Sequence, residues 1–172
     1  MIAMSNGRRA LAMALAAGLV MGVSAAGAQE PGFQRAKEFW NALSAANTEA
    51  MKGFYAKQVV LKAGSELLKK EWNLSPTVDR NKDLVVDRAT LMAGYEKMIA
   101  RFGKDAWSQV FVRLPAESVQ VTIANKPGQP FPPVQPGDVL MKVSVGRKAD
   151  TLVFVFRREG DAIAIVAERT DY

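Results

Sequence analysis

The stretch LVFVFRREGDAIAIVAERT, residues 152–170, decides the fold. Apolar and β-branched residues fill both sides of a short polar break, which is typical of two strands joined by a turn. The break, Arg158-Glu159-Gly160-Asp161, supplies a glycine for a tight hairpin. The chain is therefore predicted to end in an antiparallel pair of strands, residues 151–158 and 161–170.

Two more strands are expected before this hairpin. Val119, Val121 and Ile123 alternate with polar residues, and residues 138–146 form a second β-rich run. Residues 125–137 between them are rich in proline and glycine, which predicts a long connecting loop. The last third of the chain is thus expected to be an antiparallel meander.

Helices are expected in the first two thirds of the chain. A first helix is indicated by apolar residues at spacings of three and four, namely Phe33, Ala36, Phe39, Trp40 and Leu43. Asn47 or Thr48 is expected to cap a short second helix that continues through Met51, Phe54 and Tyr55. A brief strand, residues 58–64, and a helical turn, residues 65–72, are expected to follow.

The clearest helix follows a polar loop at residues 73–83. Asp87 is expected to cap it and Gly103 to end it, with one apolar face made by Leu91, Met92, Tyr95, Met98, Ile99 and Phe102. Residues 105–112 form a further turn or lead into the sheet. Helices that precede a meander predict an α+β fold, with helices packed on one face of a curved, mainly antiparallel sheet.

This order of elements resembles the nuclear transport factor 2-like, or SnoaL-like, superfamily of cone-shaped, cystatin-like α+β domains. The likeness covers nearly the whole chain after residue 28 and rests on the Phe39-Trp40 pair, the segment Phe54 to Leu61 and the final hairpin. It implies a pocket between helices and sheet, and frequently a dimer. Dehydratases of the superfamily use histidine, which this chain lacks, and its isomerases use a carboxylate on an early strand, where this chain has residues 59–63, VVLKA.

The first 28 residues have the three parts of a cleavable secretory signal. Arg8 and Arg9 close a short head, residues 10–23 are apolar and uncharged, and Ala26 and Ala28 supply small residues before a cleavage site. The apolar run is shorter than the roughly 20 residues of a membrane-spanning helix, so no permanent anchor is expected. We expect a signal peptide, residues 1–28, and one domain, residues 29–172, that is periplasmic or secreted.

The amino-acid composition excludes several kinds of catalytic and metal-binding site. The chain has 172 residues with no cysteine and no histidine, which excludes cysteine–histidine pairs, histidine triads and conventional zinc sites. The net charge of +6 is scattered, without the basic stripe of a nucleic-acid-binding protein. No catalytic residue, metal or cofactor is assigned.

Residues 79–87, DRNKDLVVD, are similar to a calcium-binding loop. That loop requires glycine at its sixth position and glutamate at its twelfth, and this chain has Leu84 and Thr90 there. A polar loop followed by a helix cap at Asp87 is the favoured interpretation.

Four residues are candidates for lining a pocket: Trp40, Tyr55, Trp107 and Glu168. The aromatic residues are equally suited to plain core packing. Strict alternation places Glu168 on one face with Ala162, Ala164 and Val166. There it is either a buried acid with a raised pKa or, as the simpler expectation, a solvated residue at the strand end beside an arginine.

Three functions remain open. The first is a non-catalytic exported domain that binds a small apolar or amphipathic ligand, or a protein partner, in a cone-shaped pocket. The second is a SnoaL-like isomerase or hydrolase-type enzyme that uses carboxylate and tyrosine, which requires an acidic residue buried within hydrogen-bond reach of Tyr55 inside one cavity. The third is a structural module that forms a homodimer through its sheet face.

Overall fold

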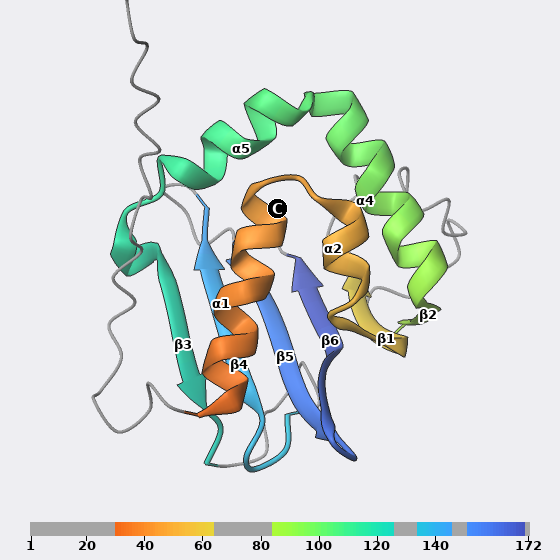
Figure 1. The fold of residues 1–172 in the computed structure, drawn as a ribbon, viewed down its shortest axis with the longest axis vertical. Coiled ribbons are helices and arrows are strands. Elements are labelled where there is room, and N and C mark those ends of the chain that lie inside the picture. Colours follow the sequence, from red (N-terminus) through yellow and green to blue (C-terminus); the bar gives the residue numbers. More distant parts are fainter. Residues whose placement is uncertain (1–29, 64–83, 126–133, 146–150, 171–172) are drawn as a thin grey trace, which may run out of the picture.

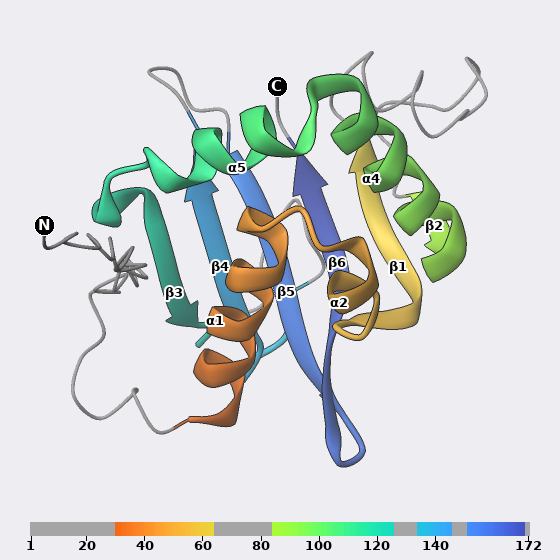
Figure 2. The same ribbon diagram turned by 45° about the horizontal axis from the view of Figure 1, so that its top comes forward.

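The computed structural model describes residues 30–63, 84–125, 134–145 and 151–170 (Figure 1). Six strands form one open sheet in the order β2-β1-β6-β5-β4-β3. The helices lie on one side of this sheet, as Figures 1 and 2 show from two directions. Only the pairing of β1 with β6 is parallel among those described, so the expected α+β fold with a mainly antiparallel sheet is confirmed.

Apart from one additional short strand, the helices and strands follow the predicted order, with bounds that differ by a few residues. The helices are α1 (Pro31–Ser44), α2 (Thr48–Lys52), α4 (Arg88–Phe102) and α5 (Lys104–Val112), with a 3₁₀ turn, η1 (Ala116–Ser118). The strands are β1 (Tyr55–Ala63), β2 (Leu84–Asp87), β3 (Val119–Ile123), β4 (Val139–Ser144), β5 (Thr151–Glu159) and β6 (Ala162–Thr170). The expected signal peptide, residues 1–28, the helical turn at residues 65–72 and the loop at 73–83 lie outside the described residues.

Local caps confirm three of the expected helix boundaries. The side chain of Asn47 accepts a hydrogen bond from the Ala50 amide at 3.0 Å, and Asp87 accepts one from the Thr90 amide at 2.9 Å. Gly103 has a φ of 82°, a conformation that favours glycine, and separates α4 from α5. Asp87 therefore acts as the expected cap, and the remainder of the calcium-like loop, residues 79–83, is not described.

Three elements differ from the sequence prediction, the first being α5, a nine-residue helix where the sequence indicates a turn or a lead into the sheet. The second helix ends at Lys52, so Tyr55 is the first residue of β1 and pairs with Ile165 of β6 instead of extending the helix. The short strand β2, which the sequence pattern did not reveal, pairs with β1 at the edge of the sheet. Tyr55 therefore belongs to a strand and not to a helix. The backbone pairing with β6 determines its conformation, although the apolar residues around it have helical spacing.

A bulge in β6 overturns the predicted alternation of faces. Phe156 pairs with Ile165 and Val155 pairs with Ala167, which leaves Val166 as an extra residue. Ile165 therefore faces the helices, Val166 and Ala167 face away, and Glu168 faces the helices again. Glu168 lies on the opposite face from Ala164 and Val166, contrary to the expectation, because a bulge shifts the alternation by one residue.

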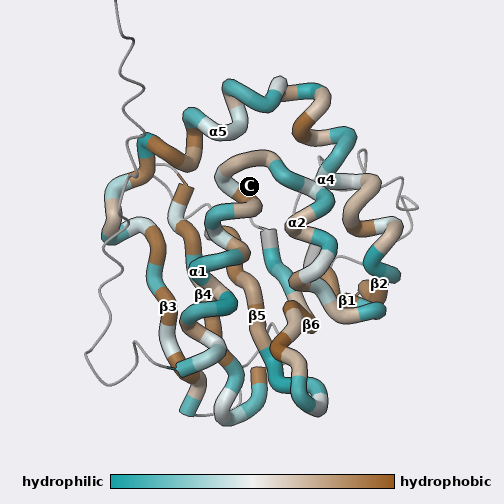
Figure 3. Tube along the Cα trace, in the orientation of Figure 1, coloured by the Kyte–Doolittle hydropathy of each residue, from teal (hydrophilic) through white to brown (hydrophobic). Residues whose placement is uncertain are grey.

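The main core lies between the helices and the sheet and centres on Phe39 of α1. Its ring makes edge-to-face contacts with four others at centroid distances of 4.8 to 5.9 Å: Phe54, Tyr55, Phe154 and Phe156. Figure 3 shows hydrophobic residues along the strands, and polar residues recur along the helices. Burial of Phe39 and Tyr95, at 0% and 4% exposure, agrees with helices covering the sheet.

Candidate functional site

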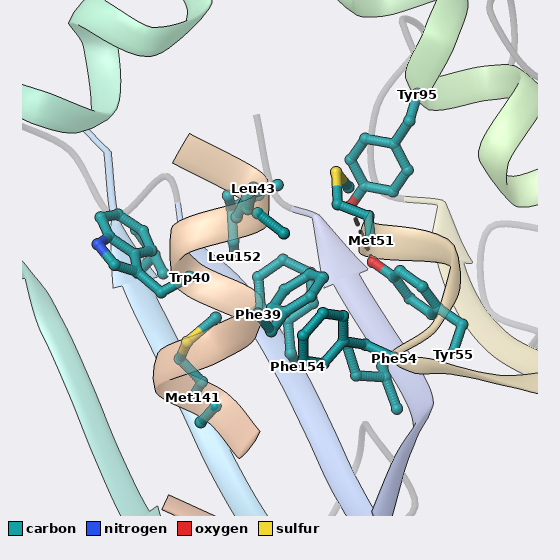
Figure 4. Close-up of a cluster of buried hydrophobic side chains, with 14 of the residues drawn as sticks. Phe39, Trp40, Leu43, Met51, Phe54, Tyr55, Tyr95, Met141, Leu152 and Phe154 are labelled. Atoms are coloured by element: carbon teal, nitrogen blue, oxygen red, sulfur yellow. Dashed lines mark hydrogen bonds between the residues drawn. The ribbon is translucent and has the colours of Figure 1, made fainter. Parts of the chain in front are cut away.

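Three oxygen-bearing side chains meet inside this core. The Tyr55 hydroxyl donates a hydrogen bond to Glu168 Oε2 at 2.7 Å, and the Tyr95 hydroxyl donates one to Glu168 Oε1 at 2.8 Å. The two hydroxyl oxygens lie 3.4 Å apart. Figure 4 shows Tyr55 and Tyr95 approaching each other from β1 and α4. We call these three residues the acid–tyrosine cluster.

Each member is held by a different element. Tyr55 follows the turn after α2, and its carbonyl accepts a hydrogen bond from Arg88 Nη1 at 3.2 Å, which ties β1 to the start of α4. Tyr95 stands on the buried face of α4, and Glu168 is turned inward by the bulge at Val166. The cluster therefore joins two strands to a helix that are distant in the sequence.

The environment of Glu168 opposes its negative charge. The side chain has 0% exposure, and burial raises its pKa to about 7, although the hydrogen bonds from Tyr55 and Tyr95 act in the opposite direction. Both donors are neutral hydroxyls, so among the contacts described for this carboxyl none supplies a compensating positive charge. Glu168 can thus exchange a proton near neutral pH.

The pKa of Tyr55 is raised as well. Burial, followed by the charge of Glu168, raises the pKa of Tyr55 well above its ordinary value. Tyr55 therefore stays protonated and acts as a hydrogen-bond donor. The cluster combines one titratable acid with two fixed donors, a set able to hold a polar group or to transfer a proton.

The structure brings two of the four candidate residues together. Tyr55 and Glu168 bond directly, which meets one of the two conditions of the carboxylate–tyrosine hypothesis, a buried acid within reach of Tyr55; the other condition is a cavity that both residues share. The simpler expectation for Glu168, a solvated strand end beside an arginine, is wrong because the bulge points its side chain into the core.

The two tryptophans lie elsewhere in the same core. Trp40 packs edge-to-face on Phe111 of α5, with ring centroids 5.5 Å apart. Trp107 donates a hydrogen bond from Nε1 to the Leu43 carbonyl at 2.7 Å, which joins α5 to the end of α1. Both are contacts between helices, consistent with core packing.

Tyr95 is the member of the cluster that sequence reasoning missed. The helical spacing identifies Tyr95 only as one of the residues on the apolar face of the helix that follows Asp87. A usable signal was present, because Tyr95 is the one residue with a polar group among the predicted buried positions of that helix, and a buried hydroxyl requires a partner.

A concave region lies on the outer face of the sheet, away from the helices. It is an open groove of about 700 Å³ lined by Ala56, Lys57, Gln58, Val60, Val85, Arg157, Glu159 and Val166. Beside it, Asp138 is 3% exposed and accepts two hydrogen bonds from Arg157, at 3.0 and 2.7 Å. These bonds raise the pKa of Arg157 above its ordinary value.

Within the described ranges, no group of three or more acidic side chains is arranged to hold a metal ion. In the same ranges, no helix has the length and apolar character needed to cross a membrane.

Comparison with known proteins shows a distant likeness among solved structures only. No protein-family model and no curated protein sequence matches the chain. Among solved structures, the chain is similar to the crystal structure of RV0760c from Mycobacterium tuberculosis, with 14% sequence identity and a TM-score of 0.35. That match covers 83% of this chain and 94% of the other.

Proposed function

We propose that this protein is an exported, non-catalytic domain of SnoaL-like fold that binds a small, largely apolar molecule at the acid–tyrosine cluster. The observation that carries the proposal is the fully buried carboxyl of Glu168, which is held by two neutral hydroxyls. Export is supported by the basic, apolar and small-residue segments within residues 1–28.

Stability alone does not explain an acid in this place. An apolar side chain of similar size fills such a site without desolvating a charge. Perturbed acids in apolar surroundings are concentrated at functional sites. The cluster therefore fits recognition better than scaffolding.

The chemistry of the cluster defines the ligand. With a pKa of about 7, Glu168 is present in both protonation states at neutral pH, so it either donates or accepts a hydrogen bond. The surrounding core is aromatic and contains Met51 and Met98, whose unbranched side chains adapt to irregular shapes. A molecule with one carbonyl or hydroxyl group on an apolar body matches this combination.

Acid–base catalysis at the same cluster is the second candidate. It is favoured by the pKa of Glu168, because an acid or base works best when its pKa lies near the operating pH. Tyr55 would then hold a substrate oxygen by donating a hydrogen bond.

One experiment separates the two candidates. The shift in melting temperature is measured with a panel of apolar ketones and alcohols for the wild type, Glu168→Gln and Asp138→Asn, the last being a matched control at the other buried carboxylate. We expect a compound that stabilises the wild type and the control but not Glu168→Gln. A panel without effect on the wild type, or an effect retained by Glu168→Gln, contradicts binding at the cluster.

The compound recovered after incubation gives the second result. An unchanged compound supports a binding domain. Conversion by the wild type, but not by Glu168→Gln, establishes acid–base catalysis instead, and mass spectrometry together with proton NMR distinguishes the two.

A further inference from the structure

The acid–tyrosine cluster is buried on every side in this structure. Glu168 is 0% exposed, and Tyr55 and Tyr95 are 2% and 4% exposed. A ligand of the kind proposed above reaches these groups only if an element that covers them moves. The element that opens most easily is the one that buries the fewest side chains in the core.

That element is the short helix α2. It buries only Met51, at 0% exposure, whereas α1, α4 and α5 bury seven, six and two residues. The helix contacts both α1 and α4. The Phe54 amide donates a hydrogen bond to the Met51 carbonyl at 2.9 Å, which places Met51 just before the start of β1. Figure 4 shows the Met51 side chain directed from α2 toward Tyr55 and Tyr95.

The chain enters α2 through a strained turn. Ala46 has a φ of 52°, the one positive φ of a residue other than glycine among the described residues. Its amide bonds to the Leu43 carbonyl at 3.1 Å, and the Asn47 amide bonds to the Ala42 carbonyl at 2.9 Å. This pair of bonds commonly ends a helix with glycine at the position of Ala46. Because alanine adopts the left-handed conformation at a cost, the turn relaxes when α2 is released.

The other end of α2 is held by Arg35 of α1. Its Nη2 donates a hydrogen bond to the Gly53 carbonyl at 2.6 Å, and its Nε donates one to the Ile163 carbonyl at 3.3 Å. The guanidinium also lies 4.0 Å from the centre of the Phe54 ring. The Arg35 side chain is 32% exposed, so water competes for these bonds. A partly exposed guanidinium and one buried methionine therefore hold α2 in place.

From this arrangement we propose that α2 is a lid over the acid–tyrosine cluster and that Met51 is its plug. In the closed state the Met51 side chain fills the space that the apolar body of the ligand takes, and the ligand enters when α2 swings out about Ala46. This role of α2 rests on the function proposed for the cluster and adds an entrance to it. A short alkyl chain or a single ring that carries one hydroxyl or carbonyl group is the class of ligand that replaces the methionine side chain.

Thiol labelling tests the lid without any ligand, so its failure overturns the lid and leaves ligand binding to the melting-temperature test described above. The chain contains no cysteine, so Met51→Cys introduces a single thiol. Met141→Cys on β4 is the matched control, because Met141 is also a methionine at 0% exposure. Both variants are reacted with 5,5′-dithiobis(2-nitrobenzoic acid) under native conditions at increasing urea concentrations.

Local opening of α2 predicts different kinetics for the two thiols. The thiol of Met51→Cys is expected to react about a hundredfold or more faster than that of Met141→Cys, at a rate that changes little with low urea. The control thiol reacts through global unfolding, so its rate rises steeply with urea. Equal rates after correction for the stability of each variant, or a steep urea dependence at both positions, overturn the lid.

A second pair of variants tests the plug. Met51→Ala is expected to leave a space beside Glu168, so cyclohexanol should raise the melting temperature of this variant by several degrees. Met141→Ala leaves a similar space on β4, which β5 separates from β6, and is expected to show no such rise. No rise in Met51→Ala, or an equal rise in both variants, overturns the placement of the ligand at Met51.

Discussion

The two buried carboxylates of the described structure lie on opposite faces of one sheet and are stabilised in different ways. Asp138, on the outer face, receives two bonds from the guanidinium of Arg157 and one from the Gln135 amide. Glu168, on the inner face, receives two bonds from neutral tyrosine hydroxyls. The two carboxylates are similarly buried, but the consequences differ. The guanidinium of Arg157 compensates the negative charge of Asp138. No cation contacts Glu168 among the bonds described, so burial disfavours its charged form and raises its pKa to about 7.

The largest expected difference between the two faces is in packing. Phe39→Ala removes a ring that contacts four others on the inner face, and about 3–5 kcal/mol of the free energy of unfolding should be lost. Val166→Ala, on the outer face, should lose about 1 kcal/mol because less apolar surface is removed. Urea unfolding of both variants measures this, and equal losses would contradict a core centred on Phe39.

The next effect is the dependence of stability on pH. The pKa of Glu168 is about 7 in the folded state and near its ordinary 4.5 in the unfolded state, so between these values the folded protein holds a proton that the unfolded chain has lost. The free energy of unfolding should therefore fall by about 3 kcal/mol from pH 4.5 to pH 7 and stay level above it.

Glu168→Gln isolates this contribution, because glutamine does not titrate. The difference in unfolding free energy between wild type and variant should change by the stated amount over that interval. A difference that is constant with pH would show that Glu168 has no raised pKa.

Breaking the outer pair should have a smaller effect. Asp138→Asn leaves Arg157 without its anionic partner, and a fully buried pair broken in this way loses roughly 3–5 kcal/mol. The Arg157 side chain is 23% exposed, so water compensates in part and we expect a loss of about 2 kcal/mol. Thermal unfolding at two salt concentrations measures it, and a variant as stable as the wild type would show that the pair contributes nothing.

The smallest effect concerns a single donor. Tyr95→Phe removes one hydrogen bond from Glu168, and since that bond lowers the pKa, the pKa of Glu168 should rise further in the variant. The loss of stability should be about 1.5 kcal/mol at pH 8, where the carboxyl is ionised, and smaller at pH 5. Equal losses at both pH values would contradict an ionised acceptor.

The sequence predicts where the helices and strands lie better than it predicts which side of the sheet each residue faces. Helical spacing around Phe39, the caps at Asn47 and Asp87, and the final hairpin are local patterns, and the structure confirms each of them. The parallel pairing of β1 with β6 and the edge strand β2 depend on residues more than 20 positions apart or on a very short segment, so no local pattern identifies them.

The bulge explains why the site itself was only partly predicted. Tyr55 and Glu168 were recognised as candidates from their residue types, but alternation assigned Glu168 to the wrong face. Residues 162–169 carry no glycine or proline to mark the extra residue at Val166, and its position follows from pairing with Val155 and Phe156 of β5. A one-residue shift of this kind moves every later residue of the strand to the opposite face of the sheet.

The most direct measurement is the pH titration of the Glu168 carboxyl carbon by ¹³C NMR, with its signal assigned by its absence from Glu168→Gln. An inward-facing acid held by two tyrosine hydroxyls predicts a midpoint at about pH 7. A midpoint near 4.5, the ordinary value for glutamate, would contradict it.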